Sequence, residues 1–191
     1  MLVNIFAQAQ KKPEYLEINP RGKVPGLLID DKLLTENAVI LLWLHDTFPE
    51  ARLLPEANNP LDRYRQISDL VWISSTWHPF VRANMMPKRW ITGDPEPVRK
   101  KGRELFADCL DQLEARLAEE QWWYGKNWSI TDVYFYWFYT TAHAGQFSLD
   151  DYPAVLRHLT DIEALPSFQR ALERERVSLP NDWNGPPISI C

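Results

Sequence analysis

The run of residues 19–44 constrains the fold of this chain more than any other segment. Two short apolar stretches, separated by a pair of aspartates, predict two strands joined by a tight turn. A threonine follows as an N-cap, and the helix after it runs to a proline that stops it. The expected elements are strands at residues 26–29 and 32–34, a turn at Asp30-Asp31, an N-cap at Thr35 and a helix over residues 38–48.

The residues before this run predict the rest of a small α/β unit. Residues 2–6 form a short apolar run, which reads as a further strand. Residues 13–18 fit a single helical turn, which Asn19-Pro20 stops. The N-terminal part is therefore expected to run strand, helical turn, two strands and helix.

From Pro60 onward the pattern is helical throughout. The link over residues 49–59 holds two prolines and Asn58-Asn59, so we expect the boundary there, with domains at residues 1–49 and 60–191. Apolar side chains at helical spacing predict the helices, and Pro79 must kink or end the first of them. The expected helices begin at Pro60 and then cover residues 98–119, 133–139 and about 154–176, before an irregular tail at residues 180–191.

A second sharp signal is the segment Trp128-Ser129-Ile130-Thr131-Asp132-Val133. Ser129 is expected to cap a helix, and Asp132, three residues later, can accept a hydrogen bond from the Ser129 amide, a variant of the capping box. Trp128 and Val133 occupy the two positions of a hydrophobic staple across that cap. The helix that follows is aromatic on every side, which predicts a central, buried element.

Charge and cysteine usage exclude several classes of function. A net charge of −5 and a pI near 5.4 give no electrostatic footprint for nucleic acid or an anionic membrane. We see no signal peptide and no run of roughly eighteen apolar residues, so no membrane span is expected. The two cysteines, Cys109 and Cys191, form neither a Cys-x-x-Cys pair nor a zinc pattern, so we expect a cytoplasmic protein without a metal site.

Two residue types are expected mainly in the core. Cys109 lies on the apolar stripe of its helix, which predicts a buried thiol and not a nucleophile. The nine tryptophans are expected to anchor a core or an interface, and some of them to line an apolar ligand site.

Residues 19–44 and the Ser129-Ile130-Thr131-Asp132 segment together resemble the glutathione transferase family, and the resemblance extends over roughly residues 13–175. It implies an α+β fold: a thioredoxin-like N-terminal domain, truncated here, followed by an all-helical C-terminal bundle. It also implies glutathione as a substrate, a small hydrophobic electrophile as the second substrate, and a homodimer.

The resemblance assigns the glutathione-binding residues. Lys23-Val24-Pro25 is implied to hold the proline in the cis form and to offer the Val24 backbone to the cysteinyl part of glutathione, as if adding a strand. Glu36 and Asn37 stand at the start of a helix, where unpaired amides favour the γ-glutamyl carboxylate and Glu36 suits the γ-glutamyl ammonium. Most family members have serine or a small residue where this chain has Asn37. The alternative is that Glu36 merely complements the helix N-terminus.

Residues 74–80 resemble the first long helix of the bacterial beta-class transferases, whose histidine faces the active-site cleft. The histidine here is His78, and Pro79 replaces the usual lysine of that class. The resemblance implies an electrophile pocket lined by Trp77, His78, Arg82 and Tyr134. The alternative for His78 is a polar helix residue with no role in the site.

The family activates the glutathione thiol with a Tyr, Ser or Cys just after its first strand. Residues 2–6 correspond to the second strand of the family, and residues 7–10 offer no hydroxyl or thiol. We therefore expect the first strand, the first helix and the catalytic residue to be absent. Either the chain is a shortened product of a full gene, or it is a natural short form in which residues 2–6 pair with the next strand or are donated across a dimer interface.

Two functions follow from these expectations. The first is a transferase that conjugates glutathione with a small electrophile. The second is a non-catalytic protein of the same fold that binds glutathione, an apolar ligand or a protein partner.

Overall fold

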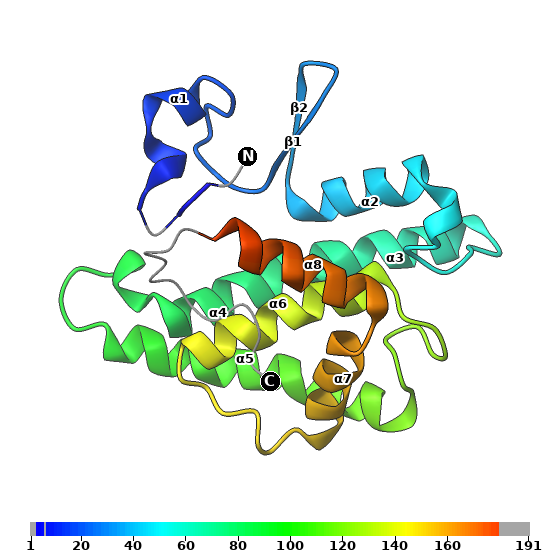
Figure 1. The fold of residues 1–191 in the computed structure, drawn as a ribbon. Helices are drawn as coiled ribbons and strands as arrows, with labels where there is room; N and C mark the ends of the chain where they lie inside the picture. Colours follow the sequence, from blue (N-terminus) through cyan, green and yellow to red (C-terminus); the bar gives the residue numbers. More distant parts are fainter. Residues whose placement is uncertain (1–2, 6, 180–191) are drawn as a thin grey trace.

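A small hairpin with two helices lies on one side of a larger set of helices (Figure 1). The computed structural model describes residues 3–5 and 7–179, so the expected tail at residues 180–191 lies outside the described residues. The elements are α1 (Pro13–Leu16), β1 (Gly26–Ile29), β2 (Lys32–Thr35), α2 (Asn37–Thr47), α3 (Pro60–Trp72), α4 (His78–Met85), α5 (Glu96–Glu119), α6 (Ile130–Ala144), α7 (Pro153–Glu163) and α8 (Pro166–Ser178).

The predicted hairpin is confirmed. β1 pairs antiparallel with β2, with Gly26 opposite Thr35 and Ile29 opposite Lys32. Asp30 and Asp31 join the strands with φ angles of 46° and 61°. A two-residue hairpin turn requires this left-handed conformation, and Asp tolerates it better than most residues.

The strand expected over residues 2–6 is wrong for the part that is described, because Val3, Asn4 and Ile5 lie in no strand. They form a turn in which the Ala7 amide donates to Asn4 Oδ1 over 3.1 Å and the Gln8 amide donates to the Ile5 carbonyl over 3.2 Å. These local hydrogen bonds therefore occupy polar groups that a strand would use to pair with a neighbouring strand. Leu2 and Phe6 lie outside the described residues, in which the sheet has two strands.

The N-cap of α2 is Glu36 and not Thr35. Thr35 stays in the ladder opposite Gly26, and its Oγ1 accepts a hydrogen bond from Arg21 over 2.8 Å. The expected helix over residues 38–48 is otherwise confirmed as α2.

The predicted break near Pro79 takes the form of a π-helical turn. Residues Ile73–Trp77 form this turn between α3 and α4, and the His78 amide donates to the Ile73 carbonyl five residues back. Because Pro79 has no amide hydrogen, a regular helix would leave a carbonyl unpaired at this point. The wider turn accommodates the proline without ending the helix.

The predicted capping box of α6 is confirmed and belongs to a larger buried network. The Ser129 amide and hydroxyl both donate to Asp132 Oδ2 over 2.7 Å. The Trp123 amide donates to the other carboxylate oxygen over 2.7 Å. His158 of α7 continues the network, with Nε2 2.9 Å from Asp132 Oδ1 and Nδ1 2.8 Å from the Tyr139 hydroxyl. The side chains of Asp132 and His158 are completely buried, so this carboxylate ties α6 to α7.

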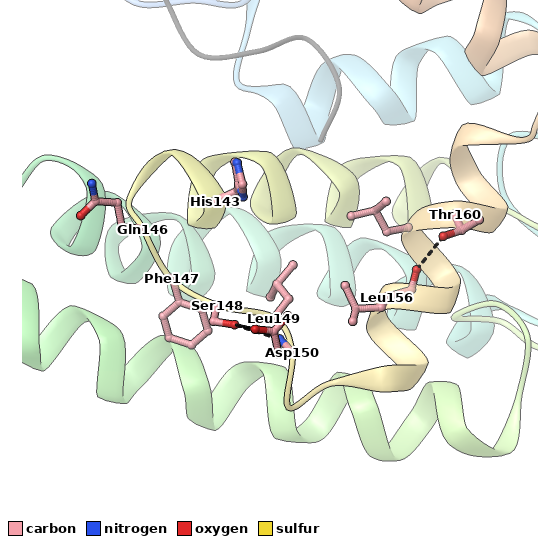
Figure 2. A pocket seen from close by; sticks show the side chains of 9 residues that line it. His143, Gln146, Phe147, Ser148, Leu149, Asp150, Leu156 and Thr160 are labelled. Carbon is pink, nitrogen blue, oxygen red and sulfur yellow. Dashed lines mark hydrogen bonds between the residues drawn. The ribbon is translucent and has the colours of Figure 1, made fainter. Parts of the chain in front are cut away.

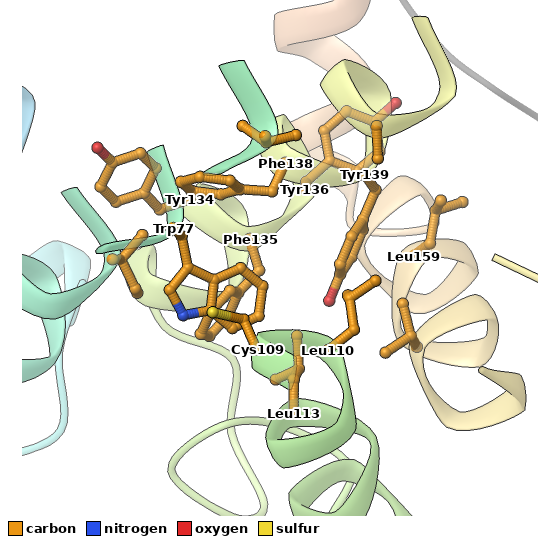
Figure 3. Close-up of a cluster of buried hydrophobic side chains, with 14 of the residues drawn as sticks. Trp77, Cys109, Leu110, Leu113, Tyr134, Phe135, Tyr136, Phe138, Tyr139 and Leu159 are labelled. Atoms are coloured by element: carbon orange, nitrogen blue, oxygen red, sulfur yellow. The ribbon is translucent and has the colours of Figure 1, made fainter. Parts of the chain in front are cut away.

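The core gathers around α6, as its aromatic sequence predicts (Figure 3). The Trp77 indole lies between α5 and α6, with ring centroids 5.0 Å from Phe135 and 5.7 Å from Phe106. Cys109 of α5 is 4% exposed, and burial raises the pKa of its thiol to about 11. Cys109 is therefore the core thiol that the sequence predicts, and not a nucleophile.

The single helix expected over residues 154–176 is wrong, because two helices occupy it. Leu165 has an extended backbone between α7 and α8, and Pro166 follows it. A residue before proline is disfavoured in the helical conformation, which explains the break.

Both carboxylate oxygens of Glu114 on α5 accept hydrogen bonds from the first turn of α7. The donors are the Ala154 and Val155 amides, each at 2.9 Å.

Replacing Asp132 with alanine should lower the free energy of unfolding by about 3 kcal/mol, because several buried donors would lose their acceptor. Urea denaturation followed by tryptophan fluorescence measures the change. Asp108→Ala is the control, since Asp108 is exposed on α5 and its loss should change the value by less than about 0.5 kcal/mol. Equal changes in the two variants would contradict a structural role for the network.

Candidate functional site

The segment before β1 presents an open stretch of backbone. The Tyr15 hydroxyl and the Asn19 side-chain amide both donate to the Lys23 carbonyl, over 2.6 and 2.8 Å, which fixes the chain just ahead of Val24. The Val24–Pro25 peptide is cis, as the resemblance implies. Pro25 is exposed and Val24 is 41% exposed, and no turn or loop hydrogen bond between described residues uses the Val24 backbone.

The start of α2 lies at the same end of the hairpin as Val24, because Gly26 pairs with Thr35. Glu36 has a φ of 70° and makes no side-chain cap, so its carboxylate projects from the helix terminus. That side chain is 72% exposed, and it forms an ion pair with Arg21 over 3.4 Å. The first turn of α2 therefore combines helix amides with an accessible carboxylate.

Tyr134 on α6 approaches this helix start from the bundle side. Its pKa is raised, first by burial and then by the charge of Glu36, while a hydrogen bond with the Asn37 side chain opposes the shift. Tyr134 is only 8% exposed. Ala38 of α2 joins the same apolar cluster as the aromatic residues of α6. These contacts hold the start of α2 against the bundle.

His78 and Arg82 lie one helical turn apart on α4 and rest on the same indole. The His78 ring stacks on Trp137 of α6 with centroids 4.8 Å apart and 17° between the planes. The Arg82 guanidinium lies 4.9 Å from the Trp137 ring centroid. Arg82 Nε is 3.5 Å from His78 Nε2, so the two groups lie side by side.

The charges around this pair are positive. Burial, and then the cations Arg82 and Lys23, lower the pKa of His78 to about 4. Burial, and then Arg89, lowers the pKa of Arg82. His78 is therefore neutral at pH 7, while Arg82 carries a charge that is partly removed from water.

The structure separates Trp77 from the other predicted site residues. Its side chain is completely buried in the core, so the place expected for it in an electrophile pocket is not favoured. Trp137, which was not among the predicted site residues, instead contacts both His78 and Arg82. Its position three residues after Tyr134 on one helix face was the available signal.

A hollow of about 580 Å³ lies elsewhere, between the end of α6 and α7 (Figure 2). The residues that line it are His143, Gln146, Phe147, Ser148, Leu149, Asp150, Leu156, Leu159 and Thr160. None of the predicted site residues is among them.

Residues 3–5 and 7–179 contain neither a candidate membrane span nor a candidate metal site. No helix there is both long and apolar enough to cross a membrane. No three His, Cys, Asp or Glu side chains there are grouped so that they could hold a metal ion.

Comparisons with known proteins point to one family. Residues 2–47 match the family model for the N-terminal domain of glutathione S-transferases, and residues 96–161 match the model for their C-terminal domain. Among curated relatives, the glutathione S-transferase GstA of Escherichia coli O157:H7 is 29% identical over 85% of this chain and 78% of its own length. A maleylacetoacetate isomerase of Pseudomonas aeruginosa is 27% identical over 84% of this chain and 76% of its own.

Solved structures agree with these matches. A sphingomonad glutathione S-transferase complexed with glutathione is 30% identical, with a TM-score of 0.76 over 88% of this chain and 81% of its own. A Sulfitobacter homologue with bound glutathione is 26% identical, with a TM-score of 0.79 over 91% of this chain and 84% of its own.

The depressed pKa of His78 predicts a particular dependence of stability on pH. The unfolded chain takes up a proton on His78 near the ordinary value of 6.5, whereas the folded protein does so only near 4. The free energy of unfolding should therefore fall as the pH drops from about 6.5 to about 4.

His78→Asn should lose less stability than the wild type over the same interval, as measured by urea denaturation at several pH values. The slopes are compared and not the absolute stabilities, because the variant also loses the stacking on Trp137. Parallel slopes would mean that the folded protein protonates His78 as readily as the unfolded chain does.

Proposed function

This chain belongs to the glutathione S-transferase family, with a thioredoxin-like N-terminal domain and a helical C-terminal domain, and we propose that it binds glutathione and joins the glutathione sulfur to a small electrophile. The observation that carries the proposal is the open backbone at Val24, beside the accessible carboxylate of Glu36. Glutathione bound in two of the similar structures supports it.

In the proposed complex the Val24 backbone pairs with the cysteinyl unit of glutathione, as an added strand would. The amides of the first turn of α2 and the side chain of Asn37 receive the γ-glutamyl carboxylate, and Glu36 receives the γ-glutamyl ammonium. Lys23, next to Val24, adds a positive charge at the end of the tripeptide opposite the γ-glutamyl group. The tripeptide then lies across this end of the hairpin, with its thiol facing α4 and α6.

The proposed reaction is a substitution at carbon. The glutathione sulfur forms a bond to the electrophilic carbon, the leaving group departs with its electron pair, and the thiol proton passes to solvent. His78, Arg82 and Tyr134 border the electrophile. His78 is neutral at pH 7, which leaves it able to accept a hydrogen bond while Arg82 keeps its charge.

We assign no described residue to the deprotonation of the thiol. The Tyr15 hydroxyl already donates to the Lys23 carbonyl, and the Cys109 thiol is buried between α5 and α6. These two observations favour the second candidate, a non-catalytic protein of the same fold that binds glutathione or another ligand. Binding without turnover distinguishes it from the enzyme.

We further propose the assembly and location that the sequence analysis expects. Leu61, Tyr64 and Val71 on α3 are 58%, 67% and 49% exposed, and their spacing places them on one helix face. A homodimer would remove such a face from water. The division into domains at residues 1–49 and 60–191 and a cytoplasmic location complete the proposal.

Calorimetric titration with glutathione tests the proposal directly. The wild type should bind glutathione in the millimolar range or tighter, and Glu36→Gln should weaken binding about fivefold, because an exposed ion pair contributes up to about 1 kcal/mol. Glu50→Gln, at an exposed position after α2, is the matched control and should leave the affinity unchanged. Absence of binding at millimolar glutathione would contradict both candidate functions that use glutathione.

Turnover separates the two candidates. The enzyme should conjugate 1-chloro-2,4-dinitrobenzene with glutathione faster than the uncatalysed reaction, as followed by absorbance. A protein that binds glutathione without accelerating this reaction fits the non-catalytic candidate.

A further inference from the structure

Arg82 is a half-buried cation without an anionic partner among the described residues. Its polar contacts are with His78 Nε2 at 3.5 Å, Met85 Sδ at 3.7 Å and Met86 Sδ at 4.0 Å, and none of these groups carries a negative charge. The arginines of the described chain that form ion pairs with carboxylates are Arg21, Arg63, Arg65, Arg99 and Arg176. A desolvated guanidinium that lacks such a partner is costly unless a ligand supplies the anion.

The surroundings of Arg82 increase this positive potential. The charged groups that act on His78 are Arg82 and Lys23, and the charged group that acts on Arg82 is Arg89. Among the described residues, the charged groups that shift the pKa of His78 or Arg82 are all cations. An acidic group, Glu36, raises the pKa of Tyr134, which lies one helical turn before Trp137 on α6. The face therefore has an acidic end at Glu36 and a basic end at Arg82.

The shape and polarity around Arg82 favour a flat apolar group beside the anion. The guanidinium and the His78 ring both lie against the Trp137 indole, and Phe138 meets the His78 ring edge-on at 6.5 Å. Two methionine sulfurs complete the surroundings of the guanidinium, and thioethers adapt readily to aromatic ligands. The guanidinium is also close to the Trp137 ring, 4.9 Å from its centroid, and a guanidinium can pair with a carboxylate through two parallel N–H groups.

We propose that Arg82 binds the carboxylate of the second substrate, so that the electrophile is an aromatic or similarly flat carboxylic acid. Arg82 pairs with the carboxylate, and the ring of the electrophile packs beside His78 and the two methionines. This inference rests on the proposed function, because it places the electrophile next to the Val24 edge on which glutathione is proposed to bind. The other source of a carboxylate is the glycyl end of glutathione itself, and the experiment distinguishes the two.

The experiment compares two ligands of nearly equal shape, 3-nitrobenzoate and 3-nitrobenzamide, by calorimetric titration at pH 7.5. The wild type should bind the benzoate about tenfold or more tightly than the benzamide, because a guanidinium–carboxylate pair is a charge-assisted bond. Arg82→Met should reduce this preference to near unity, while Arg82→Lys keeps part of it. Arg65→Met removes an exposed cation on α3 and should leave the preference unchanged.

Benzamide affinity serves as the folding control, because the neutral ligand needs the packing and not the charge. A wild type that binds the two ligands equally would overturn the proposal whatever the variants do. A preference that survives in Arg82→Met would also overturn it.

A separate titration with glutathione resolves the two sources of carboxylate and keeps the two proposals apart. If Arg82→Met weakens glutathione binding as much as benzoate binding, Arg82 serves the glycyl carboxylate and the proposal is overturned. If the wild type shows the benzoate preference but no affinity for glutathione, the anion site stands and the proposed function fails. If glutathione binds without any benzoate preference, the proposed function stands and this inference fails.

Discussion

The carboxylate of Asp132 is the buried interaction on which the helical part of this protein depends. It accepts hydrogen bonds from the amide and hydroxyl of Ser129 and from the Trp123 amide, and it meets His158 of α7. A carboxylate without solvent contact is tolerated only when its lone pairs are occupied, so these partners must all be in place together. The start of α6, the turn before it and the middle of α7 are thereby fixed by one side chain.

The position of α6 in turn determines the candidate site. Tyr134 and Trp137 project from this helix toward α2 and α4. The position of the Trp137 indole, which contacts His78 and Arg82, is therefore set by the buried helix α6. The N-terminal part contributes Val24 and Glu36 from a hairpin whose described sheet has two strands. The rigid side of the site is therefore helical, and the groups proposed for glutathione come from the smaller, more exposed part.

The sequence predicted those elements whose signal is local. The two aspartates between apolar stretches identified the hairpin, and the Ser129–Asp132 spacing identified the start of α6 with its cap. The apolar spacing along α5 placed Cys109 in the core. Each of these rests on residues within a few positions of one another, where backbone geometry leaves few alternatives.

The errors arose where a local signal was outweighed or was not informative. The apolar residues 2–6 resembled a strand, but Asn4 and the residues after it close a turn. Apolar spacing continued across Pro166 and concealed the break between α7 and α8, which the proline itself indicated. In a helix that is aromatic on every side, the spacing of Trp137 from Tyr134 was a weak signal, and Trp77 was as suitable for a pocket by residue type as His78.

The π-helical turn at Ile73–Trp77 changes which side chains of the long helix face the core after it. A π turn holds about one residue more than an α turn, so every position after it is rotated by roughly 100° around the helix axis. Trp77, the last residue of the turn, enters the core, whereas His78 and Arg82 share the new phase and meet Trp137. The extra residue thus shifts the helical phase between two parts of one long helix. The residues of α3 face α2, and the shifted residues of α4 place Arg82 against Trp137.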